Sequence, residues 1–375
     1  MNREITIAGG GIGGLALARA LEAKGIPYSV YEAAPNYANV GGGHWMYENA
    51  LKTLRAIDSR MLTELQQLGH PLDGFQFTTA SGAPIIQKSI APFVSDPEHR
   101  PLVLRRADII EVLAKGIPTH KLHFGKRVAS CTHNSLTFTD GSTASADVLI
   151  GADGIHSRVR SLLPTTRSPR YSGQVGIWGI ARLDGALPQG SKFWELWGNG
   201  IRMGCTVVGK RQAYWFMVVR SANDARIRPN PKAFVQQHMA EFPEVLQTLV
   251  RNSDPAQVQS NPLWDMPLLR KWHHQNVCCL GDAVHACTPN LGQGGCQAIE
   301  DAYCLANMLE QHSDATAAFR AFQRARWRKA SAVVLLSRWL GNFAQQGGAR
   351  IGMRNLLARH HPSALVNPVL RWLMV

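Results

Sequence analysis

A glycine-rich turn between an apolar strand and an alanine-rich helix constrains this chain more than any other feature. Ile5–Ala8 leads into Gly9, Gly11 and Gly14, which fit the pattern GxGxxG. In that pattern the first glycine permits a tight turn, the second lets backbone approach a pyrophosphate, and the third lets helix and strand pack closely. A second strand ends on Glu32, eighteen residues after Gly14, where a carboxylate can accept hydrogen bonds from a ribose. This register favours a dinucleotide-binding α/β fold over a glycine-rich turn without a ligand.

Composition indicates a compact globular protein. The chain has 375 residues, of which 45% are hydrophobic, enough for one large core or two linked cores. Residues 1–4 lead directly into a strand without the regions of a secretory signal, and no stretch of eighteen uncharged apolar residues occurs. We therefore expect a cytoplasmic protein. The seven cysteines form no CxxC pair, so we expect them to be reduced and mostly buried, and we predict no metal site.

The net charge of +14 is unevenly distributed. Residues 315–375 contain no acid, and three explanations stay open for their basic side chains: a solvated helical face, steering of an anionic substrate or pyridine nucleotide, and a weak contact with an acidic membrane surface or another macromolecule. Nucleic-acid binding is disfavoured because no DNA- or RNA-reading motif accompanies the charge. The sequence carries no signal for an oligomeric state. The basic residues are Arg320, Arg324, Arg326, Arg328, Lys329, Arg338, Arg350, Arg354, Arg359 and Arg371.

Strand and turn patterns divide the chain into a discontinuous domain and an insertion. Residues 73–87 are typical of a hairpin that turns at Gly82. Residues 169–219 are rich in β-forming residues and tryptophan, which is typical of a small sheet with one covered face. We expect a Rossmann-like α/β domain from 1–168 and 262–345, an inserted β-sheet substrate domain from 169–261, and a helical C-terminal segment from 346–375.

Three glycine-rich segments together resemble the fingerprints of the single-component FAD-dependent aromatic hydroxylases, which are flavoprotein monooxygenases similar to para-hydroxybenzoate hydroxylase. The first is the GGGIGG turn with Glu32, the second is GADGIHS at 151–157, and the third runs from GDAVH at 281–285 to LGQGG at 291–295. Their order and their separations of about 140 and 130 residues match the family, and the resemblance covers nearly the whole chain. Arg106, in the sequence RADI, resembles the family arginine that contacts the diphosphate side of the flavin.

The resemblance implies an enzyme that uses FAD, NAD(P)H and O₂ to hydroxylate an aromatic or heteroaromatic small molecule through a C4a-hydroperoxyflavin. Because the chain has only one GxGxxG, NADPH or NADH is expected to visit transiently as a co-substrate. Asp153 would lie near the pyrophosphate and the nicotinamide path, although a turn with Gly154 is an alternative. The residues that the resemblance assigns to FAD are Gly9, Gly11, Gly13, Gly14, Glu32, Arg106, Val128, Asp153, Asp282, Gly292, Gly294 and Gly295.

The substrate end of the site rests on a narrower resemblance. Residues 199–217 resemble the flavin-dependent urate hydroxylases, where an arginine and a tyrosine at the separation of Arg202 and Tyr214 face the substrate. Asn290 departs from that subgroup, which carries an aspartate there, and this puts urate itself in doubt. His44, in a loop at 41–49 that borders the flavin ring in the family, could deprotonate a phenol or be a hydrogen-bonded loop residue. The predicted catalytic set is His44, Arg202, Tyr214 and Pro289, and the pool for the pocket walls adds Trp178, Trp194, Trp197, Trp215 and Met217.

Two other functions fit the same flavin-binding motifs. A flavin-dependent epoxidase of a non-aromatic alkene would use them as well, and a non-catalytic flavin-binding protein could retain the fold without turnover. The intact glycine, aspartate and proline positions favour an enzyme. Halogenation is disfavoured because residues 194–197, with the sequence WELW, do not match the Trp-x-Trp-x-Ile motif of those enzymes.

Overall fold

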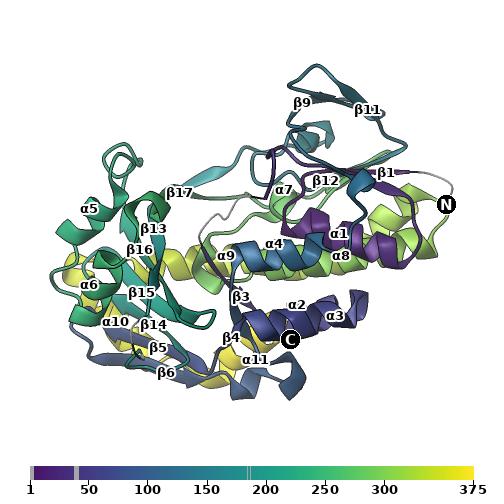
Figure 1. Ribbon diagram of the computed structural model, residues 1–375. Helices are drawn as coiled ribbons and strands as arrows, with labels where there is room; N and C mark the ends of the chain where they lie inside the picture. The colour runs from purple at the N-terminus through teal and green to yellow at the C-terminus, as the bar shows by residue number, and fades with distance from the viewer. Residues whose placement is uncertain (1–3, 38–41, 184, 186) are drawn as a thin grey trace.

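The computed structural model describes residues 4–37, 42–183, 185 and 187–375. Two large sheets lie toward opposite ends of the molecule, and long helices run between them (Figure 1). The first sheet combines strands from residues 5–31, 122–151 and 273–279, and the second combines strands from residues 74–89 and 170–265.

The first sheet is built around the N-terminal strand. Its order is β18-β19-β12-β1-β2-β8, and β1 and β12 are buried along their whole length, as expected for apolar runs between parallel neighbours. Helix α1 packs against α4 and α8, and α8 packs against α9 (Figure 1). The bounds are β1 Ile5–Ala8, β2 Tyr28–Tyr31, β8 Leu122–His123, β12 Val148–Gly151, β18 His273–His274, β19 Val277–Cys279, α1 Ile12–Ala23, α4 Arg106–Ala114, α8 Gly294–Gln311 and α9 Ala315–Ala344.

Two three-stranded sheets and two short helices extend this domain. Strands β9, β10 and β11 form an antiparallel meander, and β3 and β4 pair with opposite edges of β7. Helices α2 and α3 connect β3 to β4 and pack against α8 and α4 respectively. The bounds are β3 Gly43–Met46, α2 Glu48–Ile57, α3 Ser59–Leu68, β4 His70–Pro71, β7 Leu102–Arg105, β9 Val128–Cys131, β10 Ser135–Phe138 and β11 Thr143–Ser145.

The second sheet has the strand order β17-β13-β16-β15-β14-β5-β6. The turn predicted at Gly82 is confirmed, with a φ of +92°, but the hairpin β5–β6 pairs with β14. The sheet therefore takes strands from outside residues 169–261, and β17 also crosses residue 261. The bounds are β5 Gly74–Thr79, β6 Pro84–Ser89, β13 Arg170–Arg182, β14 Lys192–Trp197, β15 Ile201–Val208, β16 Gln212–Arg220, α5 Pro231–Gln237, α6 Glu244–Arg251 and β17 Gln259–Asp265.

The two faces of this sheet have different partners. One face, with Trp194, Trp215 and Met217, packs in a cluster that includes residues of α5 and α6. The opposite face carries Tyr214 and Phe216, which pack against the core of the first domain. The alternation of side chains therefore directs one set of residues toward the first domain.

The C-terminal segment forms two helices, α10 at Ile351–Arg359 and α11 at Ser363–Met374. The prediction of a cationic surface is wrong for part of this region. Arg326 and Arg354 are buried, while Lys329 pairs with Glu300 and Arg338 with Asp265. These side chains therefore bind acids or backbone carbonyls within the protein and do not contribute free positive charge to the surface.

The sequence predicts that the cysteines are reduced and mostly buried. Each of the seven cysteines is free, and the four at positions 205, 278, 279 and 296 are buried. Among the described residues, no helix is both long enough and apolar enough to cross a bilayer.

Candidate active site

The N-terminal glycine turn has the geometry that its pattern predicts. Gly9 adopts a φ of +104°, and a Cβ there would overlap the backbone of Ala152 in the turn after β12. A Cβ at Gly14 would overlap the Gly9 carbonyl oxygen, whereas a Cβ at Gly11 would meet no protein atom within 4 Å. The turn is therefore closed where strand and helix pack and open on the side where a ligand can approach.

The start of α1 offers unpaired backbone donors beside this opening. Gly11 is the N-cap, it makes no side-chain capping bond, and the first turn of the helix contains no acid. At the end of β2, Glu32 accepts hydrogen bonds from the backbone N–H groups of Gly10 at 2.6 Å and Ala34 at 2.8 Å. A helix N-terminus without a cap and a carboxylate fixed next to it fit the pyrophosphate and ribose of a dinucleotide.

Asp153 holds its own loop in place. It accepts from Ser157 Oγ at 2.5 Å and from the backbone N–H groups of Arg158 at 2.7 Å and Val159 at 3.2 Å. Burial raises the pKa of this carboxyl, while those donors act to lower it. The structure thus places Asp153 in a loop where it bonds to residues 157–159, and both its turn with Gly154 and its contact with the pyrophosphate or nicotinamide stay predictions.

Gly281 and Asp282 follow β19 and begin a short helical turn. Gly281 has a φ of +59°, a conformation that favours glycine. The side chain of Asp282 is exposed, yet the surrounding protein raises its pKa, against the opposing effects of His285 and Arg106. An ideal Cβ on Gly294 would lie 4.0 Å from Asp282 Oδ1, so the carboxylate lies beside the start of α8.

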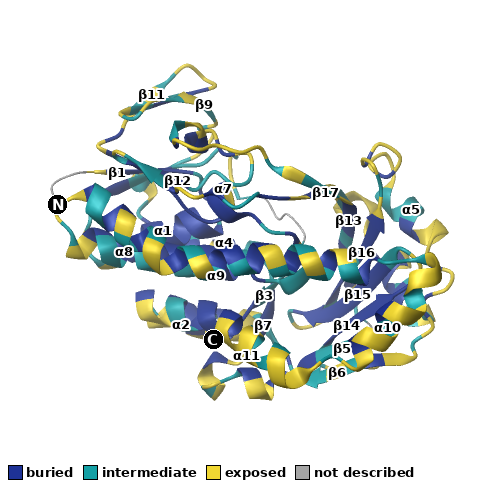
Figure 2. Ribbon diagram, turned by 180° about the vertical axis from the view of Figure 1, so that it is seen from behind, coloured by how far each residue is buried: buried dark blue, intermediate teal, exposed yellow. Residues whose placement is uncertain are grey.

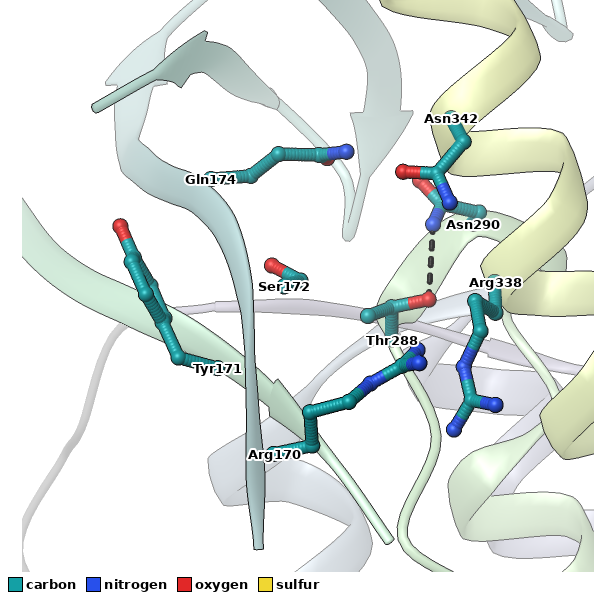
Figure 3. Close-up of a pocket in the computed structure, with 8 residues that line it drawn as sticks. All are labelled: Arg170, Tyr171, Ser172, Gln174, Thr288, Asn290, Arg338 and Asn342. Atoms are coloured by element: carbon teal, nitrogen blue, oxygen red, sulfur yellow. Dashed lines mark hydrogen bonds between the residues drawn. The ribbon is translucent and has the colours of Figure 1, made fainter. Parts of the chain in front are cut away.

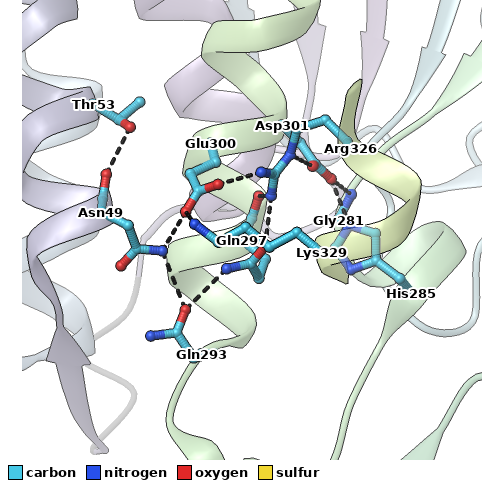
Figure 4. A network of polar contacts seen from close by, with 10 residues as sticks. All are labelled: Asn49, Thr53, Gly281, His285, Gln293, Gln297, Glu300, Asp301, Arg326 and Lys329. Atoms are coloured by element: carbon cyan, nitrogen blue, oxygen red, sulfur yellow. Dashed lines mark hydrogen bonds and ion pairs between the residues drawn. The ribbon is translucent and has the colours of Figure 1, made fainter. Parts of the chain in front are cut away.

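A buried network of charged and polar side chains contacts the turn at Gly281 (Figure 4). Asp301 of α8 accepts from the Gly281 backbone N–H at 3.0 Å, from His285 Nε2 at 2.5 Å and from Arg326 Nε at 2.7 Å. Arg326 also contacts Glu300, which pairs with Lys329. The sequence interpretation missed this network, although two adjacent acids, Glu300 and Asp301, in the otherwise mostly apolar segment 298–309 were a signal for buried partners.

The loop at 289–295, which belongs to the third glycine-rich segment, lies close to the first segment at the start of α1. Pro289 is exposed at the start of a 3-10 turn, and Gly292 adopts a left-handed conformation with a φ of +64°. Helix α8 then begins without a side-chain cap or an acid in its first turn. A Cβ on Gly295 would lie 3.2 Å from the His44 ring and 3.5 Å from Ile12 Cδ1. The N-termini of α1 and α8 therefore meet near His44.

His44 lies in strand β3, so the loop expected at 41–49 is wrong for residues 43–46, and also for 48–49, which begin α2; Gly41 lies outside the described residues. Strand β3 pairs with β7, and Arg106, the first residue of α4, donates its backbone N–H to Gly42 O at 2.9 Å. Burial and the positive charge of Arg106 lower the pKa of His44 to about 4. The imidazole is therefore neutral at physiological pH and able to accept a proton.

Tyr214 faces this region from β16. Its ring packs against Gly43, where a Cβ would collide with it, and it stands edge-on to Trp45 with 5.8 Å between ring centroids. Burial raises the pKa of Tyr214, so its phenol is neutral. Trp45 Nε1 is buried without a hydrogen-bond partner, as expected where a ligand completes a site.

Each of the three side-chain nitrogens of Arg202 donates to a protein group, and its contact with a substrate stays a prediction. Nη1 donates to Glu195 Oε1 at 2.9 Å, Nε to Gln345 Oε1 at 2.8 Å and Nη2 to Asn290 Oδ1 at 2.7 Å. Arg202 is 2% exposed. The position where the urate-type pattern is broken, Asn290, is thus one of its direct partners.

A cavity of about 230 Å³ lies next to this network. Its wall combines Gln174 and neighbouring residues of β13 with Thr288 and Asn290 and with Arg338 of α9 (Figure 3). Asn290 donates to Thr288 Oγ1 at 2.8 Å and to Ser337 O at 2.9 Å, so it bridges the cavity and Arg202.

Other predicted residues lie farther from this convergence. Trp194 and Trp215 donate their Nε1 groups to Thr78 and Ser253, and both pack with Met217 on the face shared with α5 and α6. They are core residues and not pocket walls. Val128 lies in β9 opposite Phe138, and its contact with FAD stays a prediction, as do the FAD contacts of Gly13, which packs toward Leu280.

Known proteins share both this sequence and this fold. A family model described as FAD binding domain matches residues 2–334. The FAD-dependent urate hydroxylase of Klebsiella pneumoniae subsp. pneumoniae is 32% identical over 339 residues, which cover 88% of each chain. The aurachin C monooxygenase/isomerase of Stigmatella aurantiaca is 30% identical over 345 residues, which cover 91% of this chain and 89% of the relative.

A solved structure matches over the same extent. The crystal structure of Klebsiella pneumoniae HpxO complexed with FAD and uric acid has a TM-score of 0.89 and 28% identity, and the match covers 99% of this chain and 96% of that one. Agreement along almost the entire length, together with the glycine turns described above, shows that the chain belongs to the FAD-binding-domain family and is an NAD(P)H-dependent flavoprotein monooxygenase of the aromatic hydroxylase type.

Proposed function

We propose that this monooxygenase hydroxylates a small, planar, uncharged heteroaromatic molecule. The main support for this proposal is that residues from three elements meet at the start of α8. There Gly295 lies against His44, and Tyr214 faces the same region from the second sheet. One wall is therefore aromatic and the other presents backbone N–H groups. Such a site suits a flat ring with a few polar edges.

The chain's own residues divide the work of holding the cofactor. The uncapped start of α1 would bind the pyrophosphate, Glu32 the ribose, and Asp282 the ribityl chain. FAD held by these residues and reduced by NAD(P)H would activate O₂, so that one oxygen atom goes to the substrate ring and the other leaves as water. The uncapped start of α8 would stabilise negative charge on the reduced ring because its dipole presents a positive end there.

The ion pair between Arg202 and Glu195 supports the proposal of an uncharged substrate. Its guanidinium is buried 2.9 Å from Glu195, which is also buried, so the pair presents little net charge. An anionic ring entering this site would lose its hydration and would meet a cation that is already compensated. A neutral ring loses less hydration and needs no counter-ion.

Glu195→Gln tests this proposal. The amide keeps the size of the side chain and an acceptor for Arg202 but leaves the arginine charge uncompensated. We expect KM for an anionic heteroaromatic compound to fall by about tenfold relative to a neutral compound of similar shape, which corresponds to 1.4 kcal/mol. Glu244→Gln, on an exposed part of α6, is the matched control and should leave the ratio unchanged. Equal changes for both compounds would contradict the proposal.

We further propose that His44 accepts the proton of a ring hydroxyl. Because the pKa of His44 is lowered to about 4, kcat/KM should stay level as the pH falls through 6.5 and should decline only as the pH approaches about 4. His44→Gln should lower kcat by roughly 10²- to 10⁴-fold and remove that acid limb. His238→Gln, at an exposed position, should retain the wild-type profile. A wild-type limb near 6.5 would contradict the lowered pKa, and wild-type kcat in His44→Gln would contradict the role.

The function is tested with the purified holoenzyme. Phenols, quinolones, indoles and purines are screened for stimulated NAD(P)H oxidation, and the mass of each product is measured. Gain of one oxygen atom by a ring compound supports the proposal. Gain of an oxygen only by a non-aromatic alkene supports epoxidation instead, and NAD(P)H oxidation that yields only peroxide contradicts the proposal for those compounds.

A further inference from the structure

In helix α10 a charged side chain is buried while several apolar side chains are exposed. One of its two arginines, Arg354, is fully buried and donates to the backbone carbonyls of Trp197, Gly198, Ala344 and Gln346. Three apolar side chains of the same helix point outward: Met353, Leu356 and Leu357, at 60%, 51% and 55% exposure. A helix on the surface of a soluble domain normally shows the opposite arrangement.

Helix α11 repeats this pattern. Leu365, Val369 and Trp372 are spaced as one helical face and are exposed, Leu365 at 71%. The other side of α11 is anchored, because Leu373 and Met374 are buried and Lys88 Nζ donates to Asn367 at 2.9 Å. The helix is therefore fixed to the protein by one face while the other face remains apolar and uncovered.

The exposed apolar side chains extend onto α9. Leu335 and Trp339 of α9 are 46% and 60% exposed, and the ends of α9 and α10 meet in one cluster through Ala344 and Ala358. Figure 2 shows α9, α10 and α11 from the same side, with much of α10 exposed. We call the C-terminal apolar surface the set Leu335, Trp339, Met353, Leu356, Leu357, Leu365, Val369 and Trp372.

Exposed cations accompany this surface. Arg350, Arg359 and Arg371 are exposed, on or next to α10 and α11. Residues 315–375 contain no acid, and neither does the neighbouring segment 84–95 that includes β6. A second copy of the chain would place this acid-free surface against itself in a symmetric dimer, which is electrostatically unfavourable.

We propose that the C-terminal apolar surface docks on a bilayer that contains anionic lipid. Leucine and tryptophan side chains enter the headgroup boundary while the arginines bind acidic headgroups. Helix α11, at twelve residues, is shorter than the roughly 20 residues needed to span a bilayer, so it lies in the interface. This proposal is independent of the substrate, and it makes lipophilic compounds dissolved in the bilayer accessible to the enzyme.

Vesicle co-sedimentation of the holoenzyme tests the proposal. The wild type should sediment with vesicles of phosphatidylcholine and phosphatidylglycerol, with a blue shift of tryptophan emission, and much less with phosphatidylcholine alone. Replacing Arg350, Arg359 and Arg371 by Gln should weaken binding by about fivefold per arginine. Leu365→Ser with Trp372→Ser should weaken it by about tenfold or more.

Matched controls carry the same changes elsewhere. Replacing exposed Lys210, Arg211 and Arg226 by Gln, or Leu68 by Ser at a 38% exposed position, should leave vesicle binding as in the wild type. All variants should retain FAD and turn over a water-soluble substrate normally. Absence of sedimentation, equal losses in the controls, or a dimer that Trp372→Ser converts to a monomer would overturn the proposal.

Discussion

Replacing Gly11 by alanine is expected to give a folded protein that no longer retains FAD. The added methyl group would meet no protein atom within 4 Å, so the thermal midpoint of the apoprotein should match that of the wild type. The methyl group would instead occupy the uncapped start of α1, where we propose that the pyrophosphate binds. We expect an affinity loss of at least about tenfold, or 1.4 kcal/mol, measured by titrating apoprotein with FAD.

Gly14→Ala adds the same methyl group at a closed position of the turn. Its Cβ would overlap the Gly9 carbonyl oxygen, so helix and strand must move apart, at a cost of about 1–3 kcal/mol in the free energy of unfolding. This variant should be destabilised with or without FAD. Wild-type FAD affinity in Gly11→Ala would show that the pyrophosphate does not lie at this turn.

Asp301→Asn is expected to give the largest loss of stability. The carboxylate is fully buried, and the asparagine would leave Arg326 without one of its two compensating carboxylates while weakening the bonds from His285 and Gly281. Removing one partner of a buried ion pair costs about 3–5 kcal/mol. Denaturant unfolding of the apoprotein at pH 7 measures this loss. Glu310→Gln, in a surface ion pair on the same helix, should cost less than about 1 kcal/mol.

The cost of Asp301→Asn should also depend on pH. His285 and Arg326 lower the pKa of Asp301 from 3.8 to about 2 in the folded protein. A carboxyl with a depressed folded pKa contributes its full stabilisation above its unfolded value and loses it as the pH falls toward the folded value. The stability gap between wild type and variant should therefore be constant above about pH 5 and shrink between about pH 4 and 2. A gap that does not shrink in acid would contradict an ionised Asp301.

The glycine turns could be predicted because their physical causes are local. Gly9 needs a positive φ, Gly14 needs space for a backbone contact, and both lie within one short segment between a strand and a helix. The same holds for Gly82 and its hairpin.

The polar networks could not be predicted because their members are distant in the chain. Arg202 and Gln345 are 143 positions apart, and Asp301 and Gly281 come from different elements. Arg326 looked like a surface cation since the acids that compensate it precede it by a helix and a turn. Pairing of side chains across a fold depends on how elements pack, which no local pattern in one sequence encodes.

Because the hairpin β5–β6 pairs with β14, the second sheet is built from two segments that are far apart in the chain. Strand β14 has β15 on one edge and β5 on the other, so a fragment limited to 169–261 would expose a free strand edge and invite aggregation. During synthesis, β5 can pair with β6 at once, but its other edge stays free until β14 emerges about a hundred residues later. Transplanting the insertion between relatives to change substrate preference should therefore succeed only when residues 74–89 travel with it.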